Sequence, residues 1–589
     1  MKTMQMYSST RRTMILLLSG GVVAITGCTG GPLGPMDSDF AHNLAPERTR
    51  SAGRLSIEQY KVQRPPDQAE LNKSEAEAAR LKAMATVDIT IEQVRMSALK
   101  NNLDLQVALV DPTIAEQSVT VEKAKFDAVF TPFANFLSAN TGATNATSPS
   151  FSSTLTQGQV GTGLTVPLRT GGRAAVDLIG TASETDPSVP GGGSGQNFNT
   201  SVQFSLIQPL LRGAGRDVNT ASIKIAGYNE QIVETRTKLR VISELAEADR
   251  SYWLLYAVRG ELLVRQQEYE VAKEQLARAE RRVRAQAAPE IEVTRAQSGL
   301  AARLQAIIVA ENAVLIQQRE LKRRANIPGL DVDTGSALIP KTEPNLIEYA
   351  LDSQALVKIA LGERMELLEN ELALLSDAVN IVVARNNVLP GLDLSGSILV
   401  GGSGDTITNT STGFFLGRYP TGSIGVTGSI PLGNEAAEAS LRQAVLIRMQ
   451  RLVTRQAREQ TVTQDVLNAI DRLQAAWQKV LAARQSSILA GRTLQGEQRQ
   501  FDVGARTSTD VLDAASRLAD AQSAEVRAMA EYEIAQIDLA VATGTVLGSA
   551  GIQFSPLDEQ KARDQIRSDD QQQQMDLYKK YRSEPPPVP

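Results

Sequence analysis

The sequence has almost none of the side chains on which most enzyme chemistry depends. Among 589 residues there is a single cysteine, Cys28, and a single histidine, His42, and both lie near the amino terminus. The rest of the chain therefore has no thiol nucleophile, no imidazole base, no disulfide and no histidine–cysteine metal cluster. No phosphate-binding GxxxxGK loop is present either. We therefore expect a protein that is not an enzyme and that uses no cofactor and no metal.

Aromatic residues, excess charge and long apolar runs are also scarce. Aromatic side chains make up 4% of the chain, and the net charge is −5, which gives no general attraction for nucleic acid. Beyond the amino-terminal segment there is no apolar helical run of about 18 residues, so the sequence predicts no membrane-spanning helix there. Ala, Gln, Arg, Glu and Leu dominate long stretches instead, a composition typical of long packed helices.

The amino-terminal segment explains the single cysteine. An arginine pair precedes a short apolar run, Met14–Ile25. The last residue of this run begins the sequence ITGC, which ends at Cys28. The run is too short for a lasting membrane anchor and has the length of a signal-peptide core. The ITGC ending resembles the lipobox of bacterial lipoproteins, which implies that Cys28 is lipidated. The alternative is a plain secretory signal with an incidental cysteine.

Two halves of the chain repeat the same order of patterns. In each half, segments rich in Gly, Thr and Ser carry apolar residues at every second position, as in QVGTGLTVPL at 159–168 and GSIGVTGSIPL at 422–432. This alternation predicts strands with one apolar face. Each strand region is followed by a helical pattern of about 70 residues, which corresponds to a rod of roughly 100 Å. A break and a further helix complete each half.

These patterns predict the organisation of the chain. We expect a lipoprotein signal peptide at 1–27, a tether at 28–86, a first repeat at 87–344 (strands about 127–210, long helix about 217–286), a second repeat at 345–550 (strands about 391–432, long helix about 436–501) and a disordered tail at 551–589. One chain offers too few strands to close a pore, and lipid cannot satisfy open strand edges. The sequence therefore predicts an oligomer whose copies each supply one barrel sector, with the long helices packed side by side.

This arrangement resembles the outer-membrane efflux proteins of the TolC family. The resemblance covers roughly residues 89–548, and its most specific segments are LIQPLLRGAGRDVN, LPGLDLSGS, IPLGNEAAEASLRQA and the long stretch that begins FDVGARTSTDVLDAAS and ends in AVATG. It implies a mixed α and β fold with two repeats per chain. Three copies would form an outer-membrane β-barrel that continues into a periplasmic α-helical barrel.

The resemblance also implies a function and partners. It implies a passive gated channel, the exit duct of a tripartite efflux or type I secretion system. The partners would be a periplasmic adaptor protein, an inner-membrane pump and the lipid of the outer membrane, with no nucleic acid. The protein would be lipid-anchored at the outer membrane, with its helical part in the periplasm. The alternative is a lipid-anchored coiled-coil scaffold or adhesin, with the strands as a binding head.

The first strand region is longer than the family prototype, which has two strands in each half. We expect four strands here, near 127–137, 154–168, 173–182 and 197–208. The middle two would form an additional hairpin. This hairpin either enlarges the barrel or lies against it, so a twelve-stranded barrel does not follow from the resemblance.

The stretch FDVGARTSTDVLDAAS, residues 501–516, carries the candidate functional residues. The resemblance places Arg506, Asp510 and Asp513 at a periplasmic gate, where the helical tube narrows. The two aspartates are three residues apart and therefore share one helix face. Threefold symmetry would gather six carboxylates around the axis, which favours cations. The alternative for Asp510 is a capping box with Thr507 at the start of the last helix.

The corresponding tip of the first half has a different charge pattern. When the two halves are aligned, Glu292 matches Asp510, but Arg295 matches Asp513. Four further arginines lie upstream, at positions 278, 281, 282 and 284. They indicate either a basic tip that faces an adaptor or a solvated helix face, and the charge pattern favours the solvated face.

The lipobox interpretation makes a direct prediction for Cys28→Ala. Only a thiol can accept the diacylglyceryl group, so we expect the variant to incorporate no labelled palmitate, whereas the neighbouring Thr29→Ala control stays labelled. Insertion of the barrel should survive, because a β-barrel is held in lipid without an acyl chain. Labelled palmitate in the Cys28→Ala protein would show that the lipobox interpretation is wrong.

Overall fold

The computed structural model describes residues 84–143, 151–187, 195–406, 408–410 and 419–549. All of them belong to one compact unit, which spans residues 66–556. The expected signal peptide, Cys28, most of the expected tether and the expected tail lie outside the described residues.

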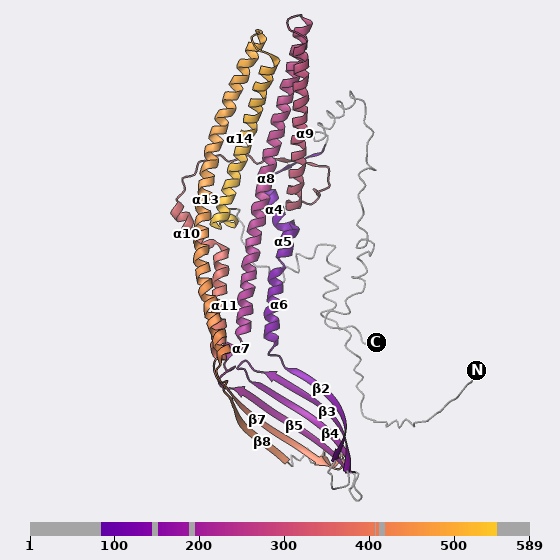
Figure 1. Ribbon diagram of the computed structural model, residues 1–589. Helices are drawn as coiled ribbons and strands as arrows, with labels where there is room; N and C mark the ends of the chain where they lie inside the picture. The colour runs from indigo at the N-terminus through magenta and orange to yellow at the C-terminus, as the bar shows by residue number, and fades with distance from the viewer. Residues whose placement is uncertain (1–83, 144–150, 188–194, 407, 411–418, 550–589) are drawn as a thin grey trace, which may run out of the picture. The chain divides into compact units, whose positions relative to one another are not determined.

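A six-stranded antiparallel sheet combines strands from both halves of the chain (Figure 1). The strands are β2 (Val129–Ala143), β3 (Phe151–Pro167), β4 (Arg173–Pro187), β5 (Gly195–Pro209), β7 (Gly391–Gly404) and β8 (Tyr419–Ser429). Their order in the sheet is β2-β3-β4-β5-β7-β8. The extra hairpin β3–β4 is therefore an integral part of the sheet, between β2 and β5, and does not lie against it.

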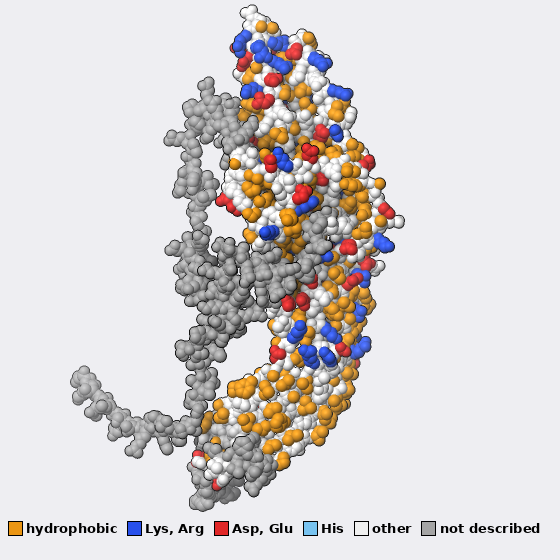
Figure 2. All heavy atoms as spheres, turned by 180° about the vertical axis from the view of Figure 1, so that it is seen from behind, with side chains coloured by type: hydrophobic (Ala, Val, Ile, Leu, Met, Phe, Trp, Pro, Cys, Tyr) orange, Lys and Arg blue, Asp and Glu red, His pale blue; other side chains and the backbone are white. Residues whose placement is uncertain are grey.

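The sheet has one apolar and one mostly polar face. Every strand pairing joins residue numbers of equal parity, as in Val160 with Gly180 and Phe204 with Ile398, so all even-numbered side chains share one face. That face carries apolar side chains that are exposed in the single chain, on all six strands: Phe130, Phe136, Val160, Leu164, Val176, Leu178, Phe204, Leu206, Ile398, Ile424 and Val426. Figure 2 shows hydrophobic side chains gathered over this sheet.

The opposite face carries the odd-numbered side chains. Most of them are polar: Gln157, Gln159, Asp177, Thr181, Ser201, Gln203, Ser395, Ser397, Ser423 and Thr427. Ser397 and Ser423 are hydrogen-bonded across β7 and β8, with their hydroxyl oxygens 2.8 Å apart. The apolar exceptions on this face include Val129, Leu137 and Ile207, which are exposed. Another exception is Phe133, whose ring covers Gly161, where an added Cβ would lie 2.6 Å from the ring. The sheet therefore separates an apolar side from a water-compatible side.

Two very long helices, α8 (Ala221–Arg284) and α13 (Glu435–Asp502), run away from the sheet. The other helices of the described residues are α4 (Ile91–Asn101), α5 (Leu103–Ala108), α6 (Asp111–Ala124), α7 (Arg216–Asn219), α9 (Ile291–Ala325), α10 (Ser353–Glu363), α11 (Met365–Asn387), α14 (Ser508–Thr543) and α15 (Val546–Ser549). With 64 residues in α8 and 68 in α13, a rise of 1.5 Å per residue makes each about 100 Å long.

The helices form a single layer with two tiers (Figure 1). Next to the sheet, α6 packs on α8, α8 on α11 and α11 on α13. Further along, α9 packs on α8, α8 on α14 and α14 on α13. The long helices α8 and α13 therefore run through both tiers. In each tier α13 lies at one edge of the layer, and α6 or α9 lies at the other.

Small residues allow the helices of the distant tier to approach closely. A Cβ added to Gly260 in α8 would lie 2.5 Å from Val526 Cγ1 of α14. One added to Gly299 in α9 would lie 2.6 Å from Leu512 Cδ1 of the same helix. Buried alanines of α14, such as Ala519, extend this close contact. A side chain at either glycine would therefore require Val526 or Leu512 to shift.

A belt crosses the helices where the two tiers meet, and the sequence patterns did not predict it. β1 (Thr86–Ile89) pairs in parallel with β6 (Ala337–Pro340). Tyr252 of α8 is fully buried beneath them, and its hydroxyl donates to the Ile89 carbonyl and accepts from the Thr342 N–H. The largest hydrophobic core of the unit surrounds this tyrosine. The belt therefore joins the start of the described chain to the connector between the two halves.

Two helical regions of the chain are interrupted. Before the first strand of the six-stranded sheet the described part of the chain forms three helices, α4, α5 and α6. The first break is at Asn102, whose side chain accepts from the Leu105 N–H and donates to the Arg324 carbonyl, so it caps α5 and joins α9. The second comes just before Pro112, in the first turn of α6. In the second half, α10 and α11 likewise separate at Arg364.

The expectation that no apolar helix follows the signal segment was wrong for α9. Among the described residues, this helix alone has the length and composition to cross a membrane. Leu304, Ile307 and Val314 of α9 are buried in the unit. Arg303 makes an ion pair with Glu268 of α8, with a distance of 3.1 Å. These three residues of α9 therefore pack within the unit, whereas Val309 and Ile316 of the same helix are exposed.

Glu533 gives the belt region a predictable pH dependence. Burial raises the pKa of Glu533 to about 7. The hydrogen bond that its carboxylate accepts from the Asn345 N–H at 2.6 Å lowers the pKa and offsets this effect only in part. Because the folded-state pKa lies above the unfolded value, the unfolded state ionises first as pH rises. The free energy of unfolding should therefore fall between about pH 4.5 and pH 7.

Glu533→Gln should remove this pH dependence and stabilise the protein at pH 8. The gain should be up to about 3 kcal/mol, since one pKa unit corresponds to about 1.36 kcal/mol. Denaturant unfolding of the helical part, followed by circular dichroism at pH 5 and pH 8, measures it. Glu525→Gln, a half-buried glutamate on the same helix, is the control. An equal loss of stability between the two pH values in wild type and Glu533→Gln would contradict the assignment.

Candidate functional site

The candidate site lies at the end of the helices far from the sheet. There α8 turns into α9, and α13 turns into α14 (Figure 1). Both turns end a long helix in the same way, with one residue in the left-handed region: Gln286 (φ 56°) and Gly504 (φ 79°). In each, the N–H of the next residue returns to the helix, from Ala287 to the Arg282 carbonyl and from Ala505 to the Gln500 carbonyl. The two tips are structural repeats.

The residues predicted from the sequence lie at the second tip. Thr507 and Asp510 form a reciprocal capping box: Asp510 Oδ2 accepts from the Thr507 N–H at 2.9 Å, and Thr507 Oγ1 accepts from the Asp510 N–H at 3.4 Å. Hydrogen bonds from the Thr507 backbone and hydroxyl, with the charge of Arg506, lower the pKa of Asp510. The capping interpretation of Asp510 is therefore confirmed, and its carboxylate stays ionised.

Arg506 and Asp513 have different surroundings. Arg506 is exposed; its Nε donates to Gln500 Oε1 at 3.0 Å and lies 3.2 Å from Glu497 Oε2. Asp513 is exposed one turn beyond Asp510 on the same helix face. Among the described residues, no hydrogen bond or ion pair joins the Asp513 carboxylate to another side chain. Two acidic side chains with a nearby arginine therefore share the start of α14.

A buried carboxylate joins the two tips within the chain. Glu292, in the first turn of α9, is 9% exposed. Its Oε2 accepts from the Ser508 N–H at 3.0 Å, and its Oε1 accepts from Arg295 Nη1 at 2.7 Å. Burial raises the pKa of Glu292, but these hydrogen bonds outweigh it and leave the pKa below its usual value. Glu292 thus supplies an ionised acceptor to the first N–H of α14.

An arginine of the first tip covers the aromatic ring of the second. Arg282 Nη1 donates to the Phe501 carbonyl at 2.9 Å, and its guanidinium carbon lies 4.7 Å from the centre of the Phe501 ring. Phe501 is buried against Val511 and Ala514 of α14. The position of Arg282 combines a cation–π contact with a hydrogen bond to a helix carbonyl. The favoured interpretation of this arginine as part of a solvated face was wrong.

Further ion pairs extend the link away from the tip. Arg303 of α9 bridges Glu268 Oε1 at 3.1 Å and the Leu512 carbonyl at 3.0 Å. The other oxygen of Glu268 accepts from Arg265, which also reaches Asp520 of α14 at 2.9 Å. Because Glu268 is 6% exposed, solvent screens this pair weakly. The two helical hairpins are therefore held together by several charged contacts.

Most of these linking residues were not found from the sequence. Glu268, Arg265 and Arg303 lie in long helical stretches whose charge pattern resembles that of a solvated surface. The contacts of Arg265 and Arg303 with α14 span more than 200 residues of sequence and leave no local signature. The one available signal was the alignment of Glu292 with Asp510, which matched their positions in the two tips. It did not show that Glu292 contacts Ser508.

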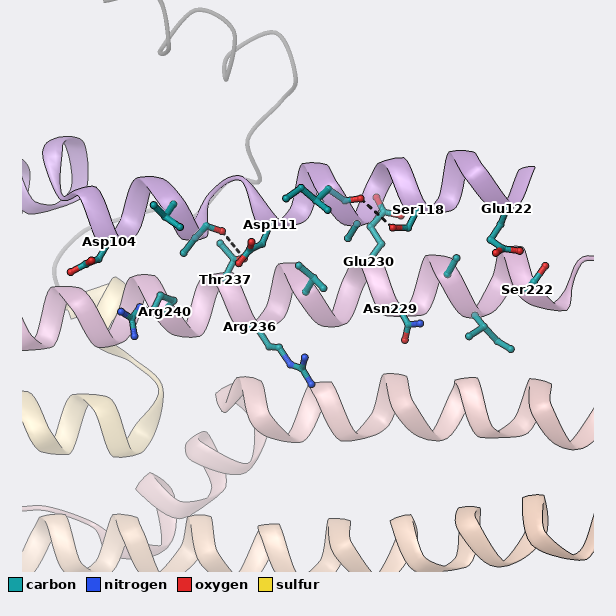
Figure 3. Close-up of a pocket in the computed structure, with 17 residues that line it drawn as sticks. Asp104, Asp111, Ser118, Glu122, Ser222, Asn229, Glu230, Arg236, Thr237 and Arg240 are labelled. Carbon is teal, nitrogen blue, oxygen red and sulfur yellow. Dashed lines mark hydrogen bonds between the residues drawn. The ribbon is translucent and has the colours of Figure 1, made fainter. Parts of the chain in front are cut away.

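A second feature lies at the α6 edge of the layer, close to the sheet. α6 and α8 run side by side and border an open groove of about 1010 Å³ (Figure 3). Thr237 of α8 lines the groove, and its hydroxyl donates to the Ala108 carbonyl at 3.3 Å. Arg236 points away from the groove toward α11, where it pairs with Glu369 at 2.6 Å. Ile114 and Val121 of α6 are 60% and 63% exposed beside it.

Neither feature resembles a catalytic centre. The tip contains carboxylates, guanidinium groups and hydroxyls that are joined by hydrogen bonds and ion pairs. Across the part of the chain that the structure describes, no group of three His, Cys, Asp or Glu side chains is placed to hold a metal ion. The arrangement at the tip can bind and repel ions and can join two helical hairpins.

The sequence is similar to outer-membrane efflux proteins. The family model described as "Outer membrane efflux protein" matches residues 356–545. Outer membrane protein TolC of Vibrio cholerae is 31% identical over 196 residues, which are 33% of this chain and 44% of that protein. Outer membrane efflux protein BepC of Brucella suis is 30% identical over 210 residues, 34% of this chain and 44% of that protein. The chain thus matches less than half the length of these relatives.

The fold is similar to solved outer-membrane channels over a longer range. A structure of CusC aligns with a TM-score of 0.57 at 16% identity and covers 78% of this chain and 93% of that one. The Campylobacter jejuni CmeC outer membrane channel aligns with a TM-score of 0.57 at 16% identity, over 83% of this chain and 89% of that one. These likenesses show that the fold is TolC-like.

The family-model match lies in the second repeat, and the structural match extends over both repeats. Residues 356–545 are therefore similar to the outer membrane efflux protein family, and the fold of the described residues is TolC-like.

Proposed function

We propose that the protein is the outer-membrane exit duct of a tripartite efflux or type I secretion system. It acts as a passive gated channel through which substrates leave the periplasm or a pump. The observation that carries this proposal is the six-stranded sheet, which exposes apolar side chains on one face and polar ones on the other. Such a sheet fits between lipid and water. A scaffold or adhesin surrounded by water would gain nothing from eleven exposed apolar side chains on one face.

The active form is a homotrimer whose copies join edge to edge. In the described residues β2 pairs only with β3, and β8 only with β7, so each sheet has two open edges. Lipid cannot satisfy open edges, and a second copy can. The helix α6 leads directly into β2, and β8 leads directly into α13. One continuous edge, β8–α13, can therefore meet the other, α6–β2, of the next copy, and such head-to-tail contacts close a ring.

The outer face of α13 supports this contact. Arg451 and Arg455 pair with Asp377 and Glu371 of α11 and mark the side of α13 that faces its neighbour. At 3.6 residues per turn, Leu446, Met449 and Val453 lie on the opposite side. Their side chains are 61%, 57% and 67% exposed. This apolar stripe of one copy packs against the groove and the exposed isoleucine and valine at the α6 edge of the next.

We infer the remaining partners from the resemblance to the family and from the sequence. A lipid on Cys28 anchors the amino terminus in the outer membrane, and a periplasmic adaptor and an inner-membrane pump meet the helical tips. Arg506, Asp510 and Asp513 form the gate at that end. The ionised state of Asp510 and the exposure of Asp513 support this assignment. Three copies would bring six carboxylates near the axis, beside three arginines.

The edge contact predicts that Val453→Asp prevents assembly. A charge in the apolar stripe loses its hydration when two copies meet and has no partner there. Light scattering in a mild detergent should give a trimer mass for wild type and a monomer mass for the variant. Val503→Asp is the control, because Val503 is 80% exposed in the tip turn, away from the edge. A trimer of the Val453→Asp protein, as stable as wild type, would contradict the proposed interface.

The gate assignment predicts that Asp510→Asn/Asp513→Asn lowers cation selectivity. The double variant removes up to six charges per trimer, whereas asparagine still caps α14. In planar bilayers under a salt gradient, the reversal potential should shift toward zero. Block by divalent cations should weaken, because closely spaced carboxylates favour a double charge. Glu525→Gln, further along α14, should change neither. Unchanged selectivity and block in the double variant would exclude these aspartates from the gate and leave the fold unaffected.

A further inference from the structure

The extra hairpin changes the size of the wall that each copy contributes. β3 pairs with β2 along the whole length of β2, from Phe151 with Ala143 to Thr165 with Val129. β4 pairs with β5 from Arg173 with Ile207 to Thr185 with Gly195. No direct pairing of β2 with β5 remains in the described residues. Any closed wall built from this sheet must therefore pass through β3 and β4.

The hairpin has the same two faces as the rest of the sheet. Val160, Leu164, Val176 and Leu178 of β3 and β4 are 66%, 42%, 37% and 44% exposed on the apolar side. The polar side of the hairpin carries Gln157, Gln159, Asp177, Thr181 and Ser183. A hairpin that lay outside the wall, or folded over it, would place one of these faces in the wrong environment.

The width of six strands also matches the width of the helices that continue from them. Next to the sheet, each copy has four helices side by side, α6, α8, α11 and α13. At 8–10 Å between axes they span roughly 32–40 Å. Six strands about 4.8 Å apart and tilted by about 40° span roughly 38 Å of arc. Without the hairpin, the four remaining strands would span only about 25 Å.

We infer that the β3–β4 hairpin widens the outer-membrane barrel to eighteen strands, six from each of three copies, closed where β8 of one copy pairs with β2 of the next. This inference rests on the proposed trimeric duct. Six is an even number, so β2 and β8 run in opposite directions and can pair antiparallel between copies. A barrel of this size leaves an aqueous channel, as in proteins of 16–18 strands. The outer passage is then about as wide as the helical tube, with no step between them.

Single-particle electron microscopy of the purified trimer in lipid nanodiscs tests the strand count. The wild-type protein should show eighteen strands in a cross-section of the membrane. A deletion of residues 144–194, with a short turn that joins β2 to β5, should leave twelve strands. Its barrel diameter should be about two thirds of the wild-type value, because diameter grows roughly linearly with strand number. The wild-type count alone decides the inference if the deletion variant does not fold.

Three outcomes are distinguishable. Eighteen strands in the wild-type trimer support the inference. A trimer that spans the membrane with twelve strands, and with β3 and β4 outside the wall, overturns the inference and leaves the exit duct intact. A protein that forms no ring, or whose sheet lies outside the bilayer, overturns both the inference and the proposed function.

Discussion

A sheet with one apolar face, one polar face and two open edges is stable in a membrane only when another chain pairs with those edges. In this protein the equal-parity register carries the apolar face without interruption from β2 to β8. Lipid can solvate that face but cannot satisfy the unpaired N–H and C=O groups of the outer strands. The need to pair these edges determines which helices lie at the sides of the layer, because α6 and α13 continue directly from the edge strands.

The long helices α8 and α13 carry this arrangement to the opposite end of the unit. Each runs through both tiers, so the packing order set beside the sheet persists at the tips. There, Glu292, Arg282 and Arg303 hold the α8–α9 hairpin against the α13–α14 hairpin through hydrogen bonds to α14 or its preceding residues. Both halves of the chain repeat one order of elements: a helical region, strands, a long helix, a turn and a further helix. This order places the capped turns of both halves at the tip and the strands of both halves in one sheet.

Local patterns in the sequence predicted the elements that have a regular period. Alternating residues such as Val160 and Leu164 indicated strands, and the Thr507–Asp510 pair indicated the start of α14. Three features had no such signal. The β1–β6 pairing joins residues about 250 apart, the ion pairs of Glu268 look like surface charges, and Asn102 breaks a helix through a contact with α9. Whether the β3–β4 hairpin lies within the sheet or against it depends on which strands pair with it, and the alternation of apolar residues does not specify the pairing partners.

The orientation of the sheet between lipid and water is the central claim, and spin labels on β5 test it most directly. Single cysteines at Val202, Gln203, Phe204 and Ser205 would carry the label in protein reconstituted into lipid vesicles. The account predicts that labels at Val202 and Phe204 collide with membrane-soluble oxygen, and that labels at Gln203 and Ser205 collide with a water-soluble nickel chelate. Equal accessibility of all four labels to the nickel chelate would contradict a membrane-embedded wall.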